Sequence, residues 1–223
     1  MRIEFGDLKL GKSARKHIDD VLKTSWVTQG PKVKEFEESW NKLFGYKYSV
    51  SMDNGTSADM AACMALYDLG VEREDEIITP ALAFAAVGNS IIASGFKPVF
   101  VDIKRDTLNI DSDKIQEKIN KKTKAIMVVH TMGKPCKIDK IMDIAKKNNL
   151  YVIEDSCEAH GAKYNGKYIG HFGDMATFSF YAAHLICCGE GGMVSTNNNE
   201  ISDLLKSVKS HGRKPDSIYF DHI

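Results

Sequence analysis

Short apolar segments alternate with helical segments along most of this 223-residue chain, and this alternation is the strongest constraint on its fold. Period-two, β-branched segments predict strands, and apolar residues spaced three and four apart predict helices. Strands are expected at residues 48–52, 76–79, 97–103, 124–130 and 150–154, and helices at residues 57–69, 84–93, 112–121, 138–148 and 200–210. The pattern is typical of an α/β fold in three layers, a mainly parallel sheet with helices on both faces. The segment 97–103 has the composition of a buried strand.

Two helices are expected before the first strand, at residues 12–22 and 33–44, separated by the breaker Gly30-Pro31. The second has an apolar stripe at helical spacing, which predicts core packing; its members are Val33, Phe36, Trp40 and Phe44. We therefore expect residues 1–47 to form an arm with helices and residues 48–223 to form the main domain.

The ends of the expected strands carry the candidate site residues. In open α/β sheets a ligand binds beyond the carboxyl ends of the strands, and these ends here carry Gly55 with Thr56, Phe84, His130 and Asp155. The turn Gly55-Thr56-Ser57 opens a helix, where free N–H groups and the helix dipole favour an anion. The same residues would also serve as an ordinary N-cap, so the residues alone leave both interpretations open.

Residues 177–194, T-F-S-F-Y-A-A-H-L-I-C-C-G-E-G-G-M-V, form the most distinctive segment. The segment begins apolar and β-prone and closes on a glycine cluster, which is useful where backbone must turn or approach a ligand. His184 lies between the two halves. Taken alone, the segment fits two strands joined by a loop with an incidental histidine as well as it fits a site.

Several motifs together resemble those of the sugar-nucleotide aminotransferases of the DegT/DnrJ/StrS group, which have the aspartate-aminotransferase fold. These are F-S-F-Y and G-E-G-G in the segment above, E-D-S-C-E-A-H-G at residues 154–161, and W-V-T-Q-G-P-K-V at residues 26–33. The resemblance covers essentially the whole chain but only the large domain of that fold, so residues 48–223 would be the large domain and the family's smaller C-terminal domain would be missing.

The resemblance implies pyridoxal 5′-phosphate (PLP) or pyridoxamine 5′-phosphate (PMP) as cofactor and assigns a role to each candidate. Gly55, Thr56, Ser57 and Ser179 would bind the phosphate, Phe84 would stack on the ring, Asp155 would face the ring nitrogen, and Glu158 would lie near the ring hydroxyl. Without the resemblance, Phe84 could be a core residue, Asp155 a loop-start residue and Ser179 an ordinary strand serine. His160 has no assigned role.

His184 occupies the position at which the family's lysine holds the cofactor covalently. An imidazole forms no lasting bond of that kind, yet it exchanges protons near neutral pH and can act as a general acid or base. The few family members with histidine here are 3-dehydratases of nucleotide-linked 4-keto-6-deoxyhexoses. We therefore expect such a dehydratase, with His184 as the catalytic residue. The alternatives are a sugar-nucleotide aminotransferase and a non-catalytic, truncated cofactor-binding homologue.

Iron–sulfur and zinc sites are not expected. One kind of histidine-type dehydratase holds a cluster partly through a C-x-C after Gly-Arg, but Gly212-Arg213 is followed here by K-P-D-S. Cys157 matches one cluster position, and a lone cysteine cannot hold a cluster. The five cysteines also lack the paired spacing of zinc sites. The chain therefore resembles the metal-free kind, in which glutamate regenerates PMP.

Charge and hydropathy limit the partners. Lys+Arg and Asp+Glu are both 30, so there is no basic footprint for nucleic acid or an anionic membrane. The amino terminus lacks the apolar region of a secretory signal, and we expect a cytoplasmic protein. The resemblance implies a nucleotide-linked keto sugar as substrate, glutamate as amino donor and a homodimer.

Overall fold

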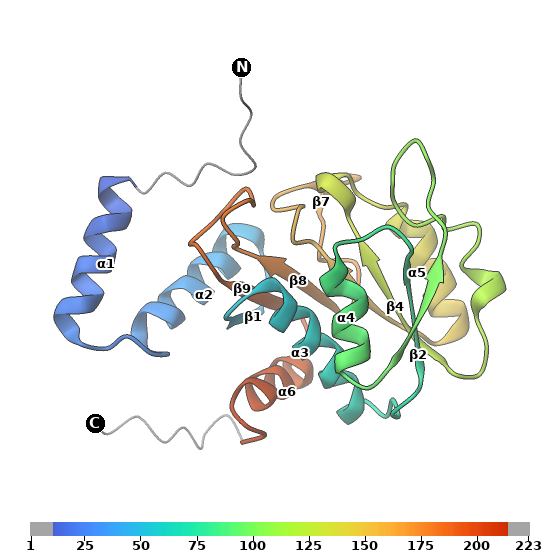
Figure 1. Cartoon of the computed structure of the whole chain (residues 1–223), viewed down its shortest axis with the longest axis horizontal. Coiled ribbons are helices and arrows are strands. Elements are labelled where there is room, and N and C mark those ends of the chain that lie inside the picture. The colour runs from blue at the N-terminus through green and yellow to red at the C-terminus, as the bar shows by residue number, and fades with distance from the viewer. Residues whose placement is uncertain (1–10, 214–223) are drawn as a thin grey trace.

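A seven-stranded mixed sheet forms the centre of the molecule (Figure 1), in a computed structural model that describes residues 11–213. The strand order is β1-β9-β8-β5-β4-β2-β3. All strands run parallel except β9, which pairs antiparallel with both β1 and β8. The strands are β1 (Tyr48–Met52), β2 (Glu76–Pro80), β3 (Lys97–Val101), β4 (Thr123–Val129), β5 (Tyr151–Asp155), β8 (Met175–Ser179) and β9 (Gly192–Thr196). A separate two-stranded hairpin is formed by β6 (Lys163–Tyr164) and β7 (Lys167–Tyr168).

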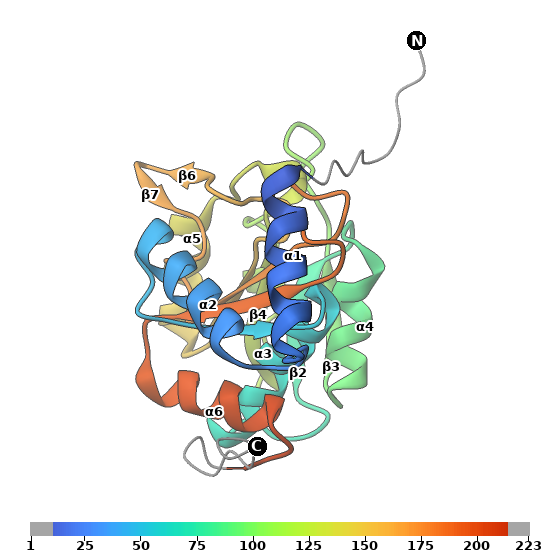
Figure 2. The ribbon, with the colours of Figure 1, turned by 90° about the vertical axis from the view of Figure 1, so that its left-hand side faces the viewer.

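Helices cover both faces of the sheet, which confirms the expected three-layer α/β fold (Figures 1 and 2). One apolar cluster packs α3 (Gly55–Asp68), α4 (Ala85–Ala93) and α6 (Asn199–Lys209) against the sheet. On the other face, α5 (Ile138–Asn148) packs on the alternate residues of the same strands. Ile77 and Ile78 illustrate the alternation, because each belongs to a different cluster. Burial on both faces explains why these strands are almost continuously apolar.

The helix α2 (Pro31–Phe44) packs its aromatic residues near the β1–β9–β8 side of the sheet. Trp40 is 3% exposed, and its indole N–H donates to Ser195 Oγ at 3.2 Å. Core packing is therefore confirmed for Trp40. It is wrong for Phe36, which is 38% exposed and touches Phe180 with its ring edge, because only the sheet-facing part of the stripe is covered.

The first helix, α1 (Lys12–Thr24), lies apart from the sheet and buries none of its residues (Figures 1 and 2). It ends where Ser25 takes the left-handed conformation, and Pro31 opens α2 at its first turn. Within residues 11–213, no helix is both long and apolar enough to cross a membrane.

Two expectations are wrong in detail. The helix expected at residues 112–121 is a single 3₁₀ turn, Gln116–Lys118, since the Asp111 carboxylate accepts the backbone N–H of Asp113 and holds a turn there instead. The strand expected to be buried at residues 97–103 is β3, an edge strand with an exposed Phe100. Pro98 is compatible with that edge position, because proline cannot donate to a neighbouring strand.

Candidate active site

Five loops meet where parallel strands end. Gly55 follows β1, Phe84 follows β2, Thr131 follows β4, Asp155 ends β5 and Ser179 ends β8. Because these strands run in one direction, their carboxyl ends lie along a single edge of the sheet. This is the arrangement in which α/β sheets bind ligands.

The N-terminus of α3 is packed so tightly that only glycine fits at two places. A Cβ atom on Gly55 would lie 2.6 Å from the Ser179 Cβ, and a Cβ on Gly192 would overlap the carbonyl group of Asn54. Strand β9 thus begins directly against the start of α3. The first N–H groups of a helix have no partner within it, so Gly55 and Thr56 offer backbone donors to an anion at this point.

Ser179 lies at this turn, as predicted. The backbone N–H of Ser57, by contrast, is engaged in a helix N-cap. Ser179 is buried beside Gly55, and its Oγ accepts the Tyr181 N–H at 3.3 Å. The Ser57 N–H donates to the Asn54 side chain at 2.8 Å, which is an ordinary N-cap. That amide is therefore already engaged, whereas Thr56 is an exposed residue.

Asp155 presents a buried carboxyl group at the end of β5. Its side chain is 5% exposed, and Oδ1 accepts the Cys157 N–H at 3.0 Å. Burial raises the pKa of Asp155, while the Cys157 bond and the nearby His130 oppose that rise. Within residues 11–213 it forms no ion pair with lysine or arginine. A cation would therefore complete its environment.

Phe84 and Glu158 lie at the rim. Phe84 is 79% exposed at the start of α4, so it is not a core residue, and its ring is free to cover a ligand. Glu158 is exposed as well, and its Oε2 accepts the Met132 N–H, which joins the loop after β5 to the loop after β4. The ring-stacking role of Phe84 and the place of Glu158 near the ring hydroxyl stay predictions.

His184 lies in the loop between β8 and β9 and is half-buried. Its ring centroid is 6.2 Å from that of His160 and 6.1 Å from that of Tyr181. His160 is buried among Trp40, Phe178 and Phe180, and within residues 11–213 neither of its ring nitrogens has a side-chain or backbone hydrogen-bond partner. Burial first, and the charge of His184 second, lower the pKa of His160 to about 4. Sequence reasoning quoted His160 only as part of a motif.

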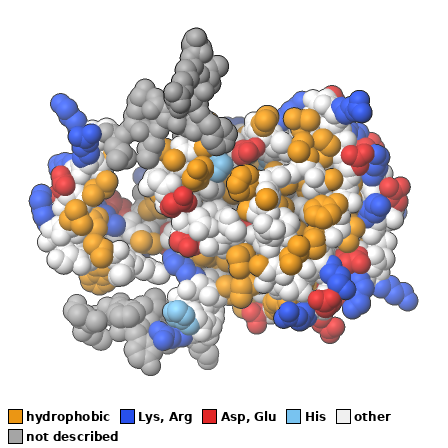
Figure 3. All heavy atoms as spheres, in the orientation of Figure 1, with side chains coloured by type: hydrophobic (Ala, Val, Ile, Leu, Met, Phe, Trp, Pro, Cys, Tyr) orange, Lys and Arg blue, Asp and Glu red, His pale blue; other side chains and the backbone are white. Residues whose placement is uncertain are grey.

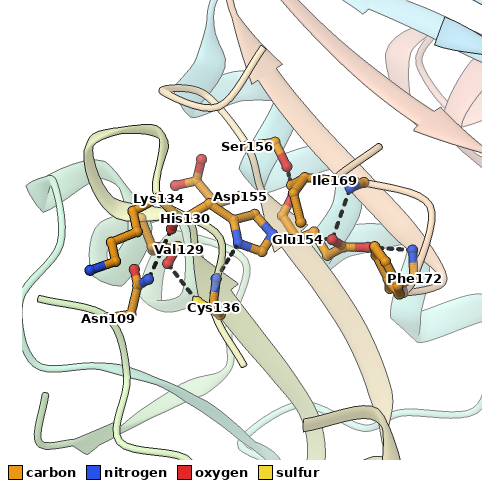
Figure 4. Close-up of polar contacts among 12 residues, drawn as sticks. Asn109, Val129, His130, Lys134, Cys136, Glu154, Asp155, Ser156, Ile169 and Phe172 are labelled. Carbon is orange, nitrogen blue, oxygen red and sulfur yellow. Dashed lines mark hydrogen bonds and ion pairs between the residues drawn. The ribbon is translucent and has the colours of Figure 1, made fainter. Parts of the chain in front are cut away.

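A buried pair behind Asp155, His130 with Glu154, holds the end of the sheet together (Figure 4). Glu154 Oε2 lies 3.1 Å from His130 Nε2 and also accepts the Gly170 N–H, while Oε1 accepts the N–H groups of Phe172 and Gly173. Burial alone would raise the pKa of Glu154, but these bonds lower it. His130 was expected among the converging site residues; it is fully buried and faces Glu154 instead.

A second carboxyl group that sequence reasoning missed lies on α3. Asp59 is 2% exposed and accepts the Thr177 hydroxyl at 2.7 Å. Its position one helical turn after Gly55 is the signal that could have found it, because residues four apart share a helix face.

The residues present fit a phosphorylated pyridine ring. The helix start offers donors where no side chain fits, Asp155 is a buried carboxyl group that pairs with no lysine or arginine among the described residues, and Phe84 is an exposed ring at the rim. Within residues 11–213, no group of three or more His, Cys, Asp or Glu side chains could hold a metal ion.

A cavity of about 810 Å³ lies on another side of α3. It is lined by residues of the α1–α2 connection, β1, α3 and α6, among them Gln29, Ser51, Met60 and Lys209. Of the predicted site residues it includes only Ser57. The geometry at the strand ends therefore marks the candidate site better than this cavity does.

Residues 9–222 match the model of the DegT/DnrJ/EryC1/StrS aminotransferase family. Among curated proteins, the GDP-perosamine synthase of Escherichia coli O157:H7 is 40% identical over 199 residues, which are 89% of this chain and 54% of that protein. The chain spans about half the length of the curated relatives it matches, 53% and 54% for two of them.

Two solved structures superimpose closely. Helicobacter pylori PseC, an aminotransferase involved in the biosynthesis of pseudoaminic acid, is 32% identical with a TM-score of 0.90, over 98% of this chain and 58% of PseC. A GDP-4-keto-6-deoxymannose-3-dehydratase with a trapped PLP-glutamate geminal diamine is 33% identical with a TM-score of 0.90, over 95% of this chain and 55% of the dehydratase. These relatives are PLP-dependent sugar aminotransferases or 3-dehydratases.

Proposed function

This chain belongs to the DegT/DnrJ/EryC1/StrS aminotransferase family, and we propose that within this PLP-dependent family it is part of a 3-dehydratase of a nucleotide-linked 4-keto-6-deoxyhexose. The reaction would serve the synthesis of deoxysugars for polysaccharides. One observation carries the choice of dehydration: a histidine, His184, stands between β8 and β9 at the position where the family has lysine.

The cofactor is the first part of the proposal. We assign its phosphate to the N–H groups of Gly55 and Thr56 with the hydroxyl of Ser179, and Ser57 to the cap that holds this turn. Phe84 would cover the ring, Asp155 would pair with the protonated ring nitrogen, and Glu158 would lie near the ring hydroxyl. When bound, PLP or PMP supplies an electron sink for reactions at the substrate carbon.

His184 is the second part. An imidazole can accept a proton on a ring nitrogen and return it, but it cannot keep the covalent link that lysine forms. The half-buried ring lies beside His160, which stays neutral at neutral pH because its pKa is about 4. A neutral neighbour leaves His184 free to change its charge without a second positive charge against it. His184 is thus the proton-transfer group of the proposed dehydration.

An aminotransferase is the alternative, and the likeness to PseC and to GDP-perosamine synthase supports it. Both functions would use the same cofactor site and a nucleotide-linked keto sugar, with glutamate as amino donor. They differ in the product. Dehydration removes the hydroxyl group at sugar C3, whereas amino transfer leaves it in place and puts an amino group at C4.

The experiment distinguishes these products. The chain, supplied with the C-terminal part that its relatives carry, is incubated with a nucleotide-linked 4-keto-6-deoxyhexose, PLP and glutamate. A 3-deoxy sugar supports the proposal; a 4-amino sugar with its C3 hydroxyl intact refutes it in favour of amino transfer. Cofactor binding with formation of neither product would favour a non-catalytic homologue.

The covalent state of the cofactor is a second check. Borohydride treatment of the chain with PLP should leave no pyridoxyl group at residue 184, as measured by mass spectrometry. Lys163 and Lys167 lie on the hairpin β6–β7, away from the segment that carries His184. A reduced pyridoxyl group on either lysine would overturn the assignment of the site.

Assembly and location complete the proposal. We assign cofactor binding to residues 48–223 and treat residues 1–47 as an arm.

A homodimer is supported by hydrophobic side chains that gather on the face seen in Figure 3, over the region of α4 in Figure 1, where Leu82, Phe84, Ile92 and Phe100 are exposed. All five cysteines are free, as is usual in the cytoplasm.

A further inference from the structure

Helix α3 and strand β8 face each other through two matched contacts. Gly55 lies against Ser179, and one helical turn later Asp59 accepts the hydroxyl of Thr177 at 2.7 Å. Thr177 is also the residue that pairs with Asp155 in the register of β5 and β8. Thr177 therefore stands between two buried carboxyl groups, Asp59 on the helix and Asp155 on the neighbouring strand.

Within residues 11–213 neither carboxyl group pairs with lysine or arginine, and His130 near Asp155 is the basic group that acts on the pair. Asp59 and Asp155 are 2% and 5% exposed, and neither forms an ion pair with lysine or arginine there. Placing two negative charges in one buried site is costly, because solvent is excluded and His130 lies near Asp155 alone. Such a pair retains one proton between its members.

The contacts decide which member keeps the proton. Asp155 accepts the Cys157 N–H and lies near His130, and both favour its charged form. Asp59 has the Thr177 hydroxyl, and its pKa is raised well above the ordinary value by burial first and by the charge of Asp155 second. The contacts therefore favour the charged form of Asp155 over that of Asp59.

Other titratable groups also face the pair. Asp59 lies near the thiols of Cys63 and Cys157, and both thiols have raised pKa values, chiefly through burial. The Cys136 thiol and the carboxylate of Glu158 lie near Asp155. The thiols stay neutral because their pKa values are raised, and Glu158 is exposed whereas Asp59 is buried. Asp59 is therefore the buried group beside Asp155 whose proton can be lost as pH rises.

We infer that Asp59 is a positioning residue of the cofactor site: it forms with Asp155 a pair of buried carboxyl groups whose shared proton sets the negative charge presented to the ring nitrogen. This inference rests on the proposed cofactor site. A protonated ring nitrogen brings one positive charge, which matches the single charge of the pair. The same cation makes the second proton easier to lose, so cofactor binding and the proton on Asp59 are linked.

The test measures PLP affinity by absorbance from pH 5 to pH 9 for the unmodified chain and for Asp59→Asn, which keeps the shape but cannot ionise. We expect the unmodified chain to gain affinity over the variant as pH rises, by at most about tenfold per pH unit for one linked proton. An analogue of PLP with carbon in place of the ring nitrogen cannot carry the cation, and the difference between the two proteins should vanish with it.

A control and a second measurement separate this role from a merely structural one. Asp174→Asn removes another largely buried carboxyl group with a raised pKa, which accepts the Val152 N–H away from the site, and should leave the PLP profile unchanged. Without cofactor, urea unfolding of Asp59→Asn, Asp155→Asn and the double variant should be non-additive, and the gain of Asp59→Asn should be larger at pH 8 than at pH 5.

The outcomes are distinct. Identical pH profiles for PLP binding to the unmodified chain and Asp59→Asn would refute the role of Asp59 and leave the proposed function untouched. Additive unfolding midpoints would refute the coupling of the two carboxyl groups. If PLP does not bind the unmodified chain at all, the proposed cofactor site is wrong, and Asp59 has no role toward it, whatever the unfolding measurements give.

Discussion

The rings of His160 and His184 lie 6.2 Å apart, at an angle of 61°, although 23 other residues separate them in the sequence. His160 belongs to the loop after β5 and His184 to the loop between β8 and β9, so the parallel pairing of β5 and β8 brings them together. The His160 ring is enclosed by aromatic side chains, and the His184 ring is half-buried in the loop between β8 and β9. The contact therefore joins the aromatic cluster under α2 to the proposed proton-transfer group.

Replacing His160 by glutamine should reduce the loss in free energy of unfolding as pH falls below neutral. In the native protein the pKa of His160 is about 4, below the ordinary value of 6.5, so the unfolded chain binds a proton first as pH falls. The stability that the neutral ring contributes is present above pH 6.5 and is lost between there and about pH 4. Between pH 7.5 and pH 4.5 the unmodified protein should lose about 2 kcal/mol more of its free energy of unfolding than His160→Gln does, as measured by urea unfolding. His17→Gln on the exposed α1 is the control, and an equal loss in all three proteins would contradict the prediction.

Replacing His184 by alanine should lower dehydration about 10²–10⁴-fold, the range typical of a general acid–base group. His184→Lys should restore a covalent link to the cofactor and shift the product toward a 4-amino sugar. Both are measured by product analysis with the same nucleotide-linked keto sugar. Tyr181→Phe in the same loop is the matched control, since its exposed ring stays in place. Unchanged dehydration in His184→Ala would remove His184 from the mechanism.

Gly55→Ala should destabilise the fold and block the helix start, because the new Cβ would lie 2.6 Å from Ser179 Cβ. Overpacking of this kind costs about 1–3 kcal/mol. Gly88→Ala on α4 is the matched control: its Cβ would meet Phe100 at an ordinary 3.6 Å, and alanine in a helix gains about 0.5–1 kcal/mol over glycine. Urea unfolding and PLP binding are measured for both. Full PLP affinity in Gly55→Ala would show that the phosphate lies elsewhere.

Glu154→Gln should destabilise the chain by about 3 kcal/mol at neutral pH, because its amide would place donors against backbone N–H groups that now donate to a carboxylate. The native pKa of Glu154 lies below the ordinary 4.5, so its contribution is full above that pH and is lost as pH falls through the native pKa. The difference between the two proteins should therefore shrink in acid, as followed by urea unfolding from pH 7 to pH 3. A constant difference would contradict the sign.

The sequence was informative wherever one local property decides the structure. Helix α5 was predicted to the residue from apolar spacing, and β1 was predicted as a short strand with the same bounds, Tyr48–Met52. The segment 112–121 failed because the Asp111 side chain competes for backbone N–H groups, which periodicity does not register. The exposure of β3 failed because edge position depends on strand order, although Pro98 gave a hint.

The same distinction holds for the site. Asp155 and Gly55 could be predicted as candidates because the carboxyl ends of parallel strands converge by a general rule, and the resemblance supplied their expected roles. Asp59 and the His160–His184 contact were missed because each depends on which helix faces which strand, and that follows from the strand order rather than from any local pattern. The role of Glu154 could not be predicted from the sequence, since its partners Phe172 and Gly173 lie in a loop of no regular structure.

Strand β9 has a consequence for how the molecule is assembled during synthesis. It fills the gap between β1 and β8, with Tyr48 opposite Thr196, and its first residue touches the start of α3. A nascent chain that ends before Gly192 therefore has no partner for β1 and no wall for the turn at Gly55. Pairing across such a sequence distance is slow, since a long loop must close first. Translation thus delivers strands β2 to β8 before the turn at Gly55 can be completed, and β9, the last strand within residues 11–213, is the one that completes it.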